Sequence, residues 1–186
     1  LNNLGIIFFS LKNFNEAIEV FKKTITIDSN YLSAHNNLGL LFKEKQNYQK
    51  AINSFEDAIN INPNYFEAYS KMGILLNNLG RLDEAQIAIK KAIDINPNYA
   101  EAYSNLGIVF RAIDEPKEAE KVTRKAIEIN YSFAEAHSNL GNILKDLGKL
   151  DEAEISTREA IKIKPDFAMA YCNLGVILRD IGNLSG

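Results

Sequence analysis

The sequence predicts an all-α fold, a solenoid of tandem helical hairpins, and three observations support this prediction. A glycine recurs every 34 residues along the chain, from Gly5 to Gly39 and onwards. Apolar residues between these glycines are spaced by three, four and seven positions, as on one face of a helix. Prolines and further glycines fall where the apolar runs end. Such a period is typical of stacked helical repeats, each of which buries its apolar face against the next.

The period divides residues 1–186 into a single array of repeats. We expect a partial repeat at 1–31, full repeats at 32–65, 66–99, 100–133 and 134–167, and a partial repeat at 168–186. Because the chain opens and closes inside a repeat, we expect a piece of a longer protein, with apolar end faces through which it could self-associate.

The first helix of each repeat contains the periodic glycine, at Gly5, Gly39, Gly73, Gly107, Gly141 and Gly175. A glycine inside a helix costs about 1 kcal/mol relative to alanine. Its recurrence therefore indicates that another helix approaches closely at this point. Leucine or methionine precedes the glycine, as at Leu38, and an aromatic residue or leucine follows three positions later, as at Phe42. We expect these larger residues to be core positions.

The second helix of each repeat follows, and residues 84–95, EAQIAIKKAIDI, are an example. Small residues recur 12 positions after each glycine, at Ala17, Ala51, Ala85, Ala119 and Ala153. Small residues also recur seven positions further on, at Thr24, Ala58, Ala92, Ala126 and Ala160. This small face is predicted to pack against the first helix.

The turns between helices are marked by glycine and proline. First helices should end in a left-handed cap at Gly80, Gly148 and Gly182, and less favourably at Lys12, Gln46 and Asp114 in the other repeats. Second helices should end ahead of Pro63, Pro97 and Pro165, with Ser29 and Tyr131 in the same position elsewhere. Pro116 should begin a second helix, where its missing amide is tolerated.

These residues resemble the tetratricopeptide repeat over essentially the whole chain. The stretches EAYSNLG (residues 101–107) and SNLGNILKDLGKLDEAE (residues 138–154) show the family's aromatic, leucine-glycine and alanine positions. They are also similar to the repeats of O-linked N-acetylglucosamine transferase. The resemblance implies a right-handed α-α superhelix that binds proteins or peptides on its concave surface. The family's later phenylalanine is replaced by Thr123 and Thr157, where we expect looser packing.

Two positions before each glycine stands a file of mostly asparagines, which we call the ladder: Asn3, Asn37, Lys71, Asn105, Asn139 and Asn173. A side-chain amide both donates and accepts hydrogen bonds, so it suits binding to the backbone of an extended peptide. The resemblance to the transferase implies the same peptide contact, although Lys71 interrupts the file. The alternative is that these side chains are solvated, or that they link adjacent helices by hydrogen bonds.

Charged residues flank the ladder. Four positions before it stand Glu67, Glu101 and Glu135, and six positions after it stand Lys43, Arg111, Lys145 and Arg179. Pairing within or between hairpins is the first interpretation, and such surface pairs contribute little to stability. Selection of a partner by charge is the second interpretation.

We expect no catalytic residue, no metal ligand and no cofactor site. His35 and His137 lie in the position that holds tyrosine in other repeats, and we interpret them as core or boundary residues. Cys172 stands where other repeats have serine, as a small residue of the inner face. Paired carboxylates such as Asp151 and Glu152 fall in the first turn of second helices, where the helix dipole favours them.

The composition argues against several classes of partner. A net charge of −3 gives no basic field for nucleic acid or anionic lipid, and no apolar run has the length of a membrane span. A single cysteine allows no internal disulfide, which favours a reducing, cytoplasmic setting. We therefore predict a protein-interaction scaffold that binds an extended peptide or a partner helix in its concave groove. The alternative is the substrate-targeting arm of a larger enzyme, such as a glycosyltransferase-like protein.

Overall fold

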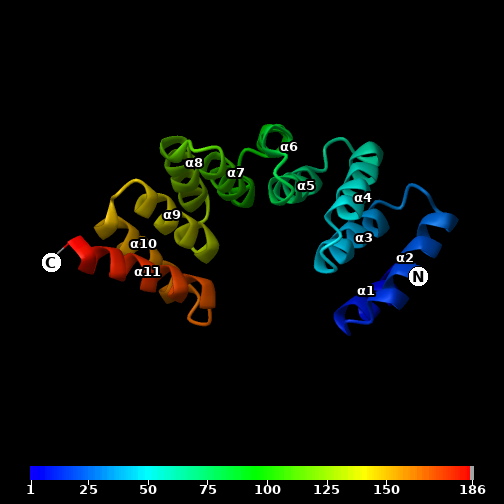
Figure 1. Cartoon of the computed structure of the whole chain (residues 1–186). Coiled ribbons are helices and arrows are strands. Elements are labelled where there is room, and N and C mark those ends of the chain that lie inside the picture. The colour runs from blue at the N-terminus through cyan, green and yellow to red at the C-terminus, as the bar shows by residue number, and fades with distance from the viewer. Residues whose placement is uncertain (185–186) are drawn as a thin grey trace. The chain divides into compact units, whose positions relative to one another are not determined.

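The computed structural model describes residues 1–184, which form eleven helices and, within that range, no strand. In chain order the helices are α1 (Asn2–Ser10), α2 (Phe14–Ile27), α3 (Leu32–Glu44), α4 (Tyr48–Ile61), α5 (Phe66–Asn78), α6 (Leu82–Ile95), α7 (Ala100–Ala112), α8 (Pro116–Ile129), α9 (Ala134–Asp146), α10 (Leu150–Ile163) and α11 (Ala168–Leu184) (Figure 1). Odd-numbered helices contain the periodic glycines and are the first helices of the repeats. The all-α prediction is confirmed.

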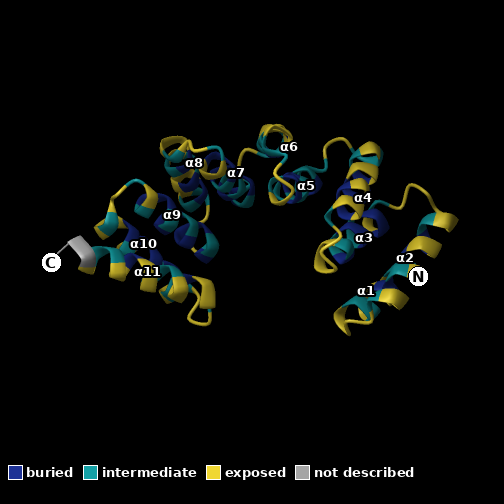
Figure 2. Cartoon of the chain, in the orientation of Figure 1, coloured by how far each residue is buried: buried dark blue, intermediate teal, exposed yellow. Residues whose placement is uncertain are grey.

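The chain divides into two compact units. The N-terminal unit, Leu1–Ile95, contains α1 to α6, and the C-terminal unit, Asn96–Gly186, contains α7 to α11. Within each unit a second helix packs against the first helix of its own hairpin and against the first helix of the next. Successive first helices also touch, as α7 does with α9 and α9 with α11. Buried residues line the faces where these helices meet (Figure 2).

The periodic glycines lie where the two helices of a hairpin approach most closely. A Cβ atom added to Gly39 would stand 2.8 Å from Cε1 of Phe55, a fully buried residue of α4. The same place is filled in the other hairpins by Phe21 against Gly5, Ile89 against Gly73, Thr123 against Gly107 and Thr157 against Gly141. The predicted close approach is therefore confirmed at five glycines. At Gly175 nothing among the described residues lies within 4 Å of such a Cβ.

The expectation of looser packing at Thr123 and Thr157 is wrong. Both side chains are fully buried, and their Oγ1 atoms are the first that a Cβ on Gly107 or Gly141 would meet. The backbone of the second helix also comes within reach, because the carbonyl oxygen of Ala119 would be 3.3 Å from a Cβ on Gly107. The threonine side chain thus fills the contact with the glycine, as the larger side chains do in the other hairpins.

The turn inside each hairpin contains one residue in the left-handed region. Gly80 and Gly148 have φ angles of 75° and 74°, and Lys12, Gln46 and Asp114 have φ angles of 61°, 56° and 62°. In the first hairpin, the N–H of Lys12 donates to the carbonyl of Phe9 (3.0 Å) and the N–H of Asn13 to that of Phe8 (2.9 Å). The predicted cap is confirmed at these five positions.

The prediction of a cap at Gly182 is wrong, because this glycine lies inside α11. In the other hairpins, a second helix packs behind the left-handed residue and fixes the turn. No such helix follows Gly182 among the described residues, and α11 continues through it.

The turns between hairpins begin with an extended residue, such as Asn62 with φ −132° and ψ 95°. Its Oδ1 accepts a hydrogen bond from the N–H of Asn64 at 3.0 Å. This is an Asx turn, in which a side-chain oxygen takes the place of a main-chain carbonyl as the acceptor. Asp28 and Asn130 form the same turn. These side chains explain why the turn keeps its shape where Ser29 and Tyr131 replace proline. Pro116 is the first residue of α8, as predicted.

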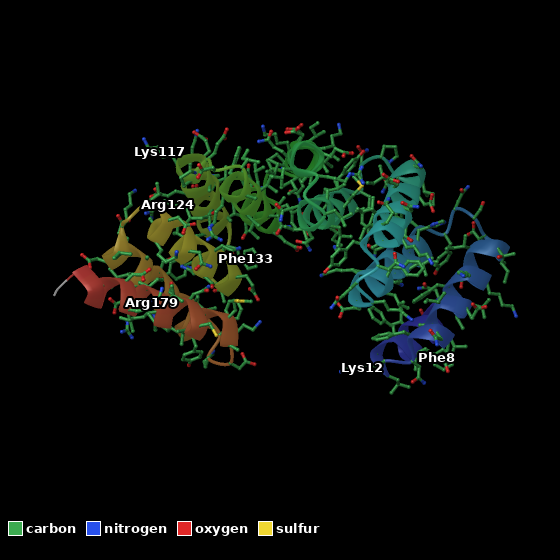
Figure 3. All side chains as sticks on the ribbon, in the orientation of Figure 1. Phe8, Lys12, Lys117, Arg124, Phe133 and Arg179 are labelled. Carbon is green, nitrogen blue, oxygen red and sulfur yellow. The ribbon has the colours of Figure 1, made fainter. Side chains whose placement is uncertain are left out.

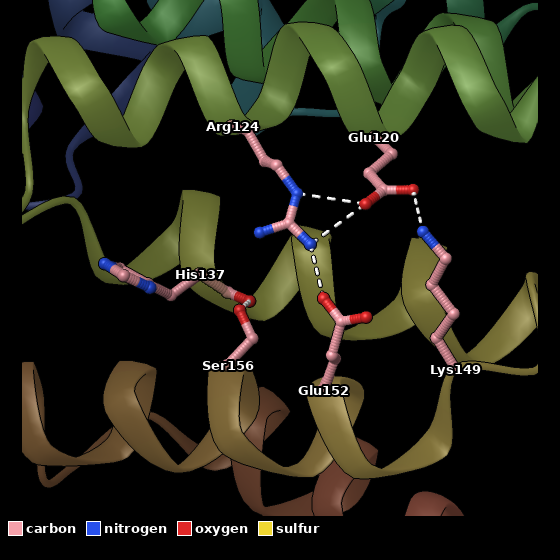
Figure 4. Close-up of polar contacts among 6 residues, drawn as sticks. All are labelled: Glu120, Arg124, His137, Lys149, Glu152 and Ser156. Carbon is pink, nitrogen blue, oxygen red and sulfur yellow. Dashed lines mark hydrogen bonds and ion pairs between the residues drawn. The ribbon is translucent and has the colours of Figure 1, made fainter.

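A group of ion pairs joins the second helices α8 and α10 of the C-terminal unit (Figure 4). Arg124 donates to Glu120 of its own helix at 3.0 Å and to Glu152 of α10 at 2.6 Å. Lys149, just before α10, donates to Glu120 at 2.8 Å. Partial burial alone would raise the pKa of Glu120, but the hydrogen bonds from Lys149 and Arg124 lower it below its ordinary value. These bonds fasten one hairpin to the next.

Candidate functional site

The ladder residues lie on the first helices, and Asn37, Asn139 and Asn173 among them hydrogen-bond to the preceding first helix. The side-chain amides donate from Nδ2 as follows: Asn37 to Oδ1 of Asn2 (3.2 Å), Asn139 to Oγ of Ser104 (3.0 Å), and Asn173 to Oγ of Ser138 (3.0 Å). Each acceptor stands 35 residues before its donor. The ladder therefore links adjacent helices, which is the alternative that the sequence left open. A hydrogen bond to a partner in addition is compatible with this, since each amide has a second N–H and a carbonyl oxygen.

Lys71 interrupts the ladder in the N-terminal unit, and this leaves Asn36 without the asparagine donor that the other acceptors have. Asn36 precedes Lys71 by the same interval that separates the other donors and acceptors, so it occupies the acceptor position. Its Oδ1 atom is buried and accepts no hydrogen bond from the described residues. The donor of lysine lies at the end of a long stem, so it does not reproduce the short amide of asparagine.

The ladder residues and the acidic flanking residues of the C-terminal unit come together in a groove of about 490 Å³, which we call the ladder groove. Three first helices line it, with Glu101, Ser104, Asn105 and Ile108 from α7, Glu135, Ser138, Asn139 and Asn142 from α9, and Met169 and Asn173 from α11. Phe133 and Phe167 complete the lining from the turns before α9 and α11; Phe133 is labelled in Figure 3.

Sequence reasoning missed the aromatic residues of this groove. An aromatic residue stands just before every first helix from α3 onwards, at Tyr31, Tyr65, Tyr99, Phe133 and Phe167. This regular position was a usable signal, because it places a ring at the edge of each first helix. In the groove these rings supply apolar surface beside the amides, together with Ile108 and the largely exposed Met169.

The remaining ladder and flanking residues of the N-terminal unit lie on its own first helices and are not part of the ladder groove. Asn3 is exposed on α1, and Asn37 and Lys71 are partly buried on α3 and α5. Lys43 is exposed near the end of α3, and Glu67 is partly buried in the first turn of α5. Neither Lys43 nor Lys71 forms an ion pair with a described residue.

The basic flanking residues of the C-terminal unit pair with aspartates outside the ladder groove. Arg111 of α7 forms an ion pair with Asp146 of α9, and Lys145 lies 3.0 Å from the same carboxylate. Burial alone would raise the pKa of Asp146, but the hydrogen bonds from Arg111 and Lys145 lower it below its ordinary value. Arg179, labelled in Figure 3, pairs with the neighbouring Asp180 at 3.1 Å.

The acidic flanking residues, by contrast, line the groove. Glu135 accepts a hydrogen bond from Nζ of Lys164 at 3.1 Å, and Glu101 accepts one from the hydroxyl of Tyr99 at 2.7 Å. The ladder groove therefore has a polar floor of amides and hydroxyls, two carboxylates, and apolar edges.

The two histidines have packing roles. Nε2 of His35 lies 2.9 Å from the carbonyl oxygen of Ser29, and Nε2 of His137 lies 2.9 Å from that of Tyr131. Since a carbonyl only accepts, Nε2 is the donor in both pairs. Tyr171 occupies the same position and donates to the equivalent carbonyl, six residues before it. These rings thus hold the turn between hairpins, in agreement with their interpretation as boundary residues.

Cys172, the single cysteine of the sequence, is exposed and free. Within the described part of the chain, no group of three or more His, Cys, Asp or Glu side chains is placed to bind a metal ion. Among the described helices, none combines the length and apolar character needed to cross a lipid bilayer.

Comparison with family models gives matches along most of the chain. A model described as "TPR repeat" matches residues 5–46 and 40–80, and models described as "Tetratricopeptide repeat" match residues 64–132 and 134–167. A search of curated proteins gave no match.

Comparison with solved structures gives matches to tetratricopeptide repeat proteins. The crystal structure of MamA is 26% identical, with 88% of this chain and 96% of that chain covered and a TM-score of 0.74. TTC0263, a thermophilic TPR protein of Thermus thermophilus, is 20% identical, with 95% and 96% covered and a TM-score of 0.79. YrrB, described as a TPR protein with an unusual peptide-binding site, is 22% identical, with 91% and 88% covered and a TM-score of 0.67.

Proposed function

Since the chain belongs to the tetratricopeptide repeat family, we propose that it is a protein-interaction scaffold that binds an extended peptide or a partner helix along its first helices. The observation that supports this proposal most directly is the ladder groove, where amides from three successive first helices lie beside two phenylalanine rings. A peptide-binding site in the similar protein YrrB is consistent with the proposal.

The chemistry of the groove suits a peptide main chain. An extended peptide presents N–H and C=O groups that each need a partner when water is displaced. Asn139 and Asn173 are already oriented by their bonds to Ser104 and Ser138, so little side-chain freedom is lost when a peptide binds. The rings of Phe133 and Phe167 offer apolar surface for side chains of the partner.

We further propose that the chain contributes binding and no catalysis. The packing roles of His35 and His137 support this, because both rings already hydrogen-bond to main-chain carbonyls. A cytoplasmic setting is also part of the proposal, supported by the single free thiol of Cys172.

The test is selection from a random peptide library, followed by fluorescence anisotropy with the selected peptides. Asn139→Ala should weaken binding about five- to tenfold, the loss expected for one or two hydrogen bonds. Ser104→Ala breaks the same bond between α7 and α9 but leaves the amide of Asn139 in the groove, so it should weaken binding less.

Asn60→Ala provides a control, because Asn60 is exposed on the second helix α4 and should not affect affinity. Asn142→Ala removes a groove amide that has no hydrogen bond to the described residues. Unchanged affinity in both Asn105→Ala and Asn139→Ala would remove the ladder from the binding surface, and unchanged affinity in Asn142→Ala as well would remove the other groove amide.

A further inference from the structure

The ladder groove has a chemical character that selects among peptides. Building on the proposed function, we infer that it takes an extended segment that carries lysine or arginine beside apolar side chains. Four observations on the groove and its surroundings support this choice of partner.

Charge is the first observation. The ionisable residues that line the groove are Glu101 and Glu135, and no lysine or arginine is among its lining residues. The nearby cations Arg111 and Lys145 are bound to Asp146. The groove is therefore acidic, and a cationic segment is complementary to it.

The second observation concerns Lys164, which already pairs with Glu135 from within the chain. The side chains of Lys164 and Glu135 are 45% and 46% exposed, and an ion pair so open to water contributes little to stability. A cation from a partner can therefore join or replace Lys164 at Glu135 at small cost. Lys164 thus shows where an incoming ammonium group would lie.

Hydrogen-bond polarity is the third observation. Asn139 and Asn173 each donate from Nδ2 to a serine, whereas their Oδ1 atoms accept no hydrogen bond from the described residues. Together with the carboxylates, these oxygens make the groove rich in acceptors. Lysine and arginine side chains are donors only, so they match it.

The apolar edge is the fourth observation. Phe133, Phe167 and Ile108 lie beside the acceptors, and Nζ of Lys164 is 5.0 Å from the centroid of the Phe167 ring. At this distance an ammonium group is attracted to the face of the ring. A segment that combines cations with apolar side chains can therefore use both parts of the groove.

The experiment uses three pools of degenerate peptides that differ at alternate positions, which are Lys or Arg in the first pool, Asp or Glu in the second, and Ser or Gln in the third. The remaining positions vary among apolar residues in all three. Anisotropy with the whole chain should show the basic pool binding most tightly. The affinity for the basic pool should fall when the salt concentration is raised from about 0.05 M to about 0.5 M, because salt screens exposed charges.

The double variant Glu101→Gln and Glu135→Gln should lower the affinity for the basic pool about three- to tenfold, the size expected for two exposed ion pairs. The matched control is Glu118→Gln with Glu128→Gln, which removes the same charge from two exposed glutamates of α8 that pair with Lys121 and Lys125. Helical circular dichroism during heating verifies that both double variants are folded.

The outcomes separate this inference from the proposed function. Equal binding of the neutral and basic pools, or preference for the acidic pool, would overturn the choice of a basic segment but leave peptide binding intact. An equal loss of affinity in the control double variant would also overturn it, because the effect would then be one of net charge. Failure of all three pools to bind would overturn both proposals.

Discussion

Nδ2 of Asn139 lies 3.0 Å from Oγ of Ser104, so a residue that we propose as a peptide contact also joins α9 to α7. The same relation holds between Asn173 and Ser138, which joins α11 to α9. Mutating a ladder residue therefore changes the fold's stability and the groove together, and experiments on binding need stability controls.

Ser104→Ala should destabilise the fold by about 0.5–1.5 kcal/mol, the usual contribution of one hydrogen bond. Ser104 is almost fully buried, so water does not replace the lost acceptor. Urea unfolding followed by circular dichroism measures the change. Ser33→Ala, at an exposed position of α3, reports the gain in helix propensity alone; an equal effect of both substitutions would contradict the role of this bond.

Lys71→Asn should stabilise the fold by about 1 kcal/mol. The new amide would stand 35 residues after Asn36, as Asn139 does after Ser104, and would supply a donor for the buried Oδ1 of Asn36. Urea unfolding is the measurement, with Lys43→Asn as the comparison at an exposed position of the N-terminal unit. If Lys71→Asn leaves the stability unchanged or lowers it, Oδ1 of Asn36 does not accept a hydrogen bond from position 71.

Gly107→Ala should destabilise the fold by about 1–3 kcal/mol, the range for overpacking of a core, because the new Cβ would clash with Thr123. Gly175→Ala should instead stabilise it by up to about 1 kcal/mol through helix propensity, since nothing among the described residues lies within 4 Å. Thermal unfolding distinguishes the two. A similar effect of both would mean that the glycines are not there for close approach.

Asp146→Asn should reduce the loss of stability in acid. The pKa of Asp146 is lowered in the folded chain from its ordinary value of 3.8, so its carboxylate stabilises the fold above that pH. This contribution is lost as the pH falls through the lower, folded pKa. The difference in unfolding free energy between the parent and Asp146→Asn should therefore shrink below about pH 4.

The comparison for this pH dependence is Asp94→Asn. Asp94 is exposed on α6 and forms no ion pair with the described residues. If both substitutions change the pH profile equally, the pairing of Asp146 with Arg111 and Lys145 is not the cause.

Helices and turns followed from the sequence because they depend on local rules. Backbone geometry within a few residues decides several of these features. Examples are the position of Pro116, the left-handed residues Lys12 and Gln46, and the ends of second helices. Gly182 was the exception, because a cap also needs a following helix to fix the turn. Local sequence does not contain that information.

Contacts between helices could be predicted from the sequence only in part. The period placed Thr123 opposite Gly107 but did not show that the Oγ1 of this smaller side chain would still fill the contact. It also placed Asn139 on a helix face without identifying Ser104 as its partner, since that depends on how one hairpin is shifted relative to the next. The aromatic position of Phe133 and Phe167 was visible in the sequence as a recurrence, but its place beside the ladder was not.

Several predictions from the sequence stay open. They are the division into repeats at the stated boundaries, the similarity to O-linked N-acetylglucosamine transferase with the alternative of an enzyme's targeting arm, and self-association through end faces. Absence of binding to nucleic acid likewise stays a prediction from the net charge of −3. The open reading frame around this chain would address the second of these, and its mass in solution would address self-association.

The contact between a periodic glycine and its bulky neighbour is contained in one hairpin, as with Gly39 and Phe55 or Gly141 and Thr157. A hairpin that is duplicated, deleted or exchanged by recombination in its gene would therefore carry both sides of this fit with it. Phenylalanine, isoleucine and threonine can alternate along the chain for the same reason, because a change of size in one hairpin needs no compensating mutation at the glycine contact of another.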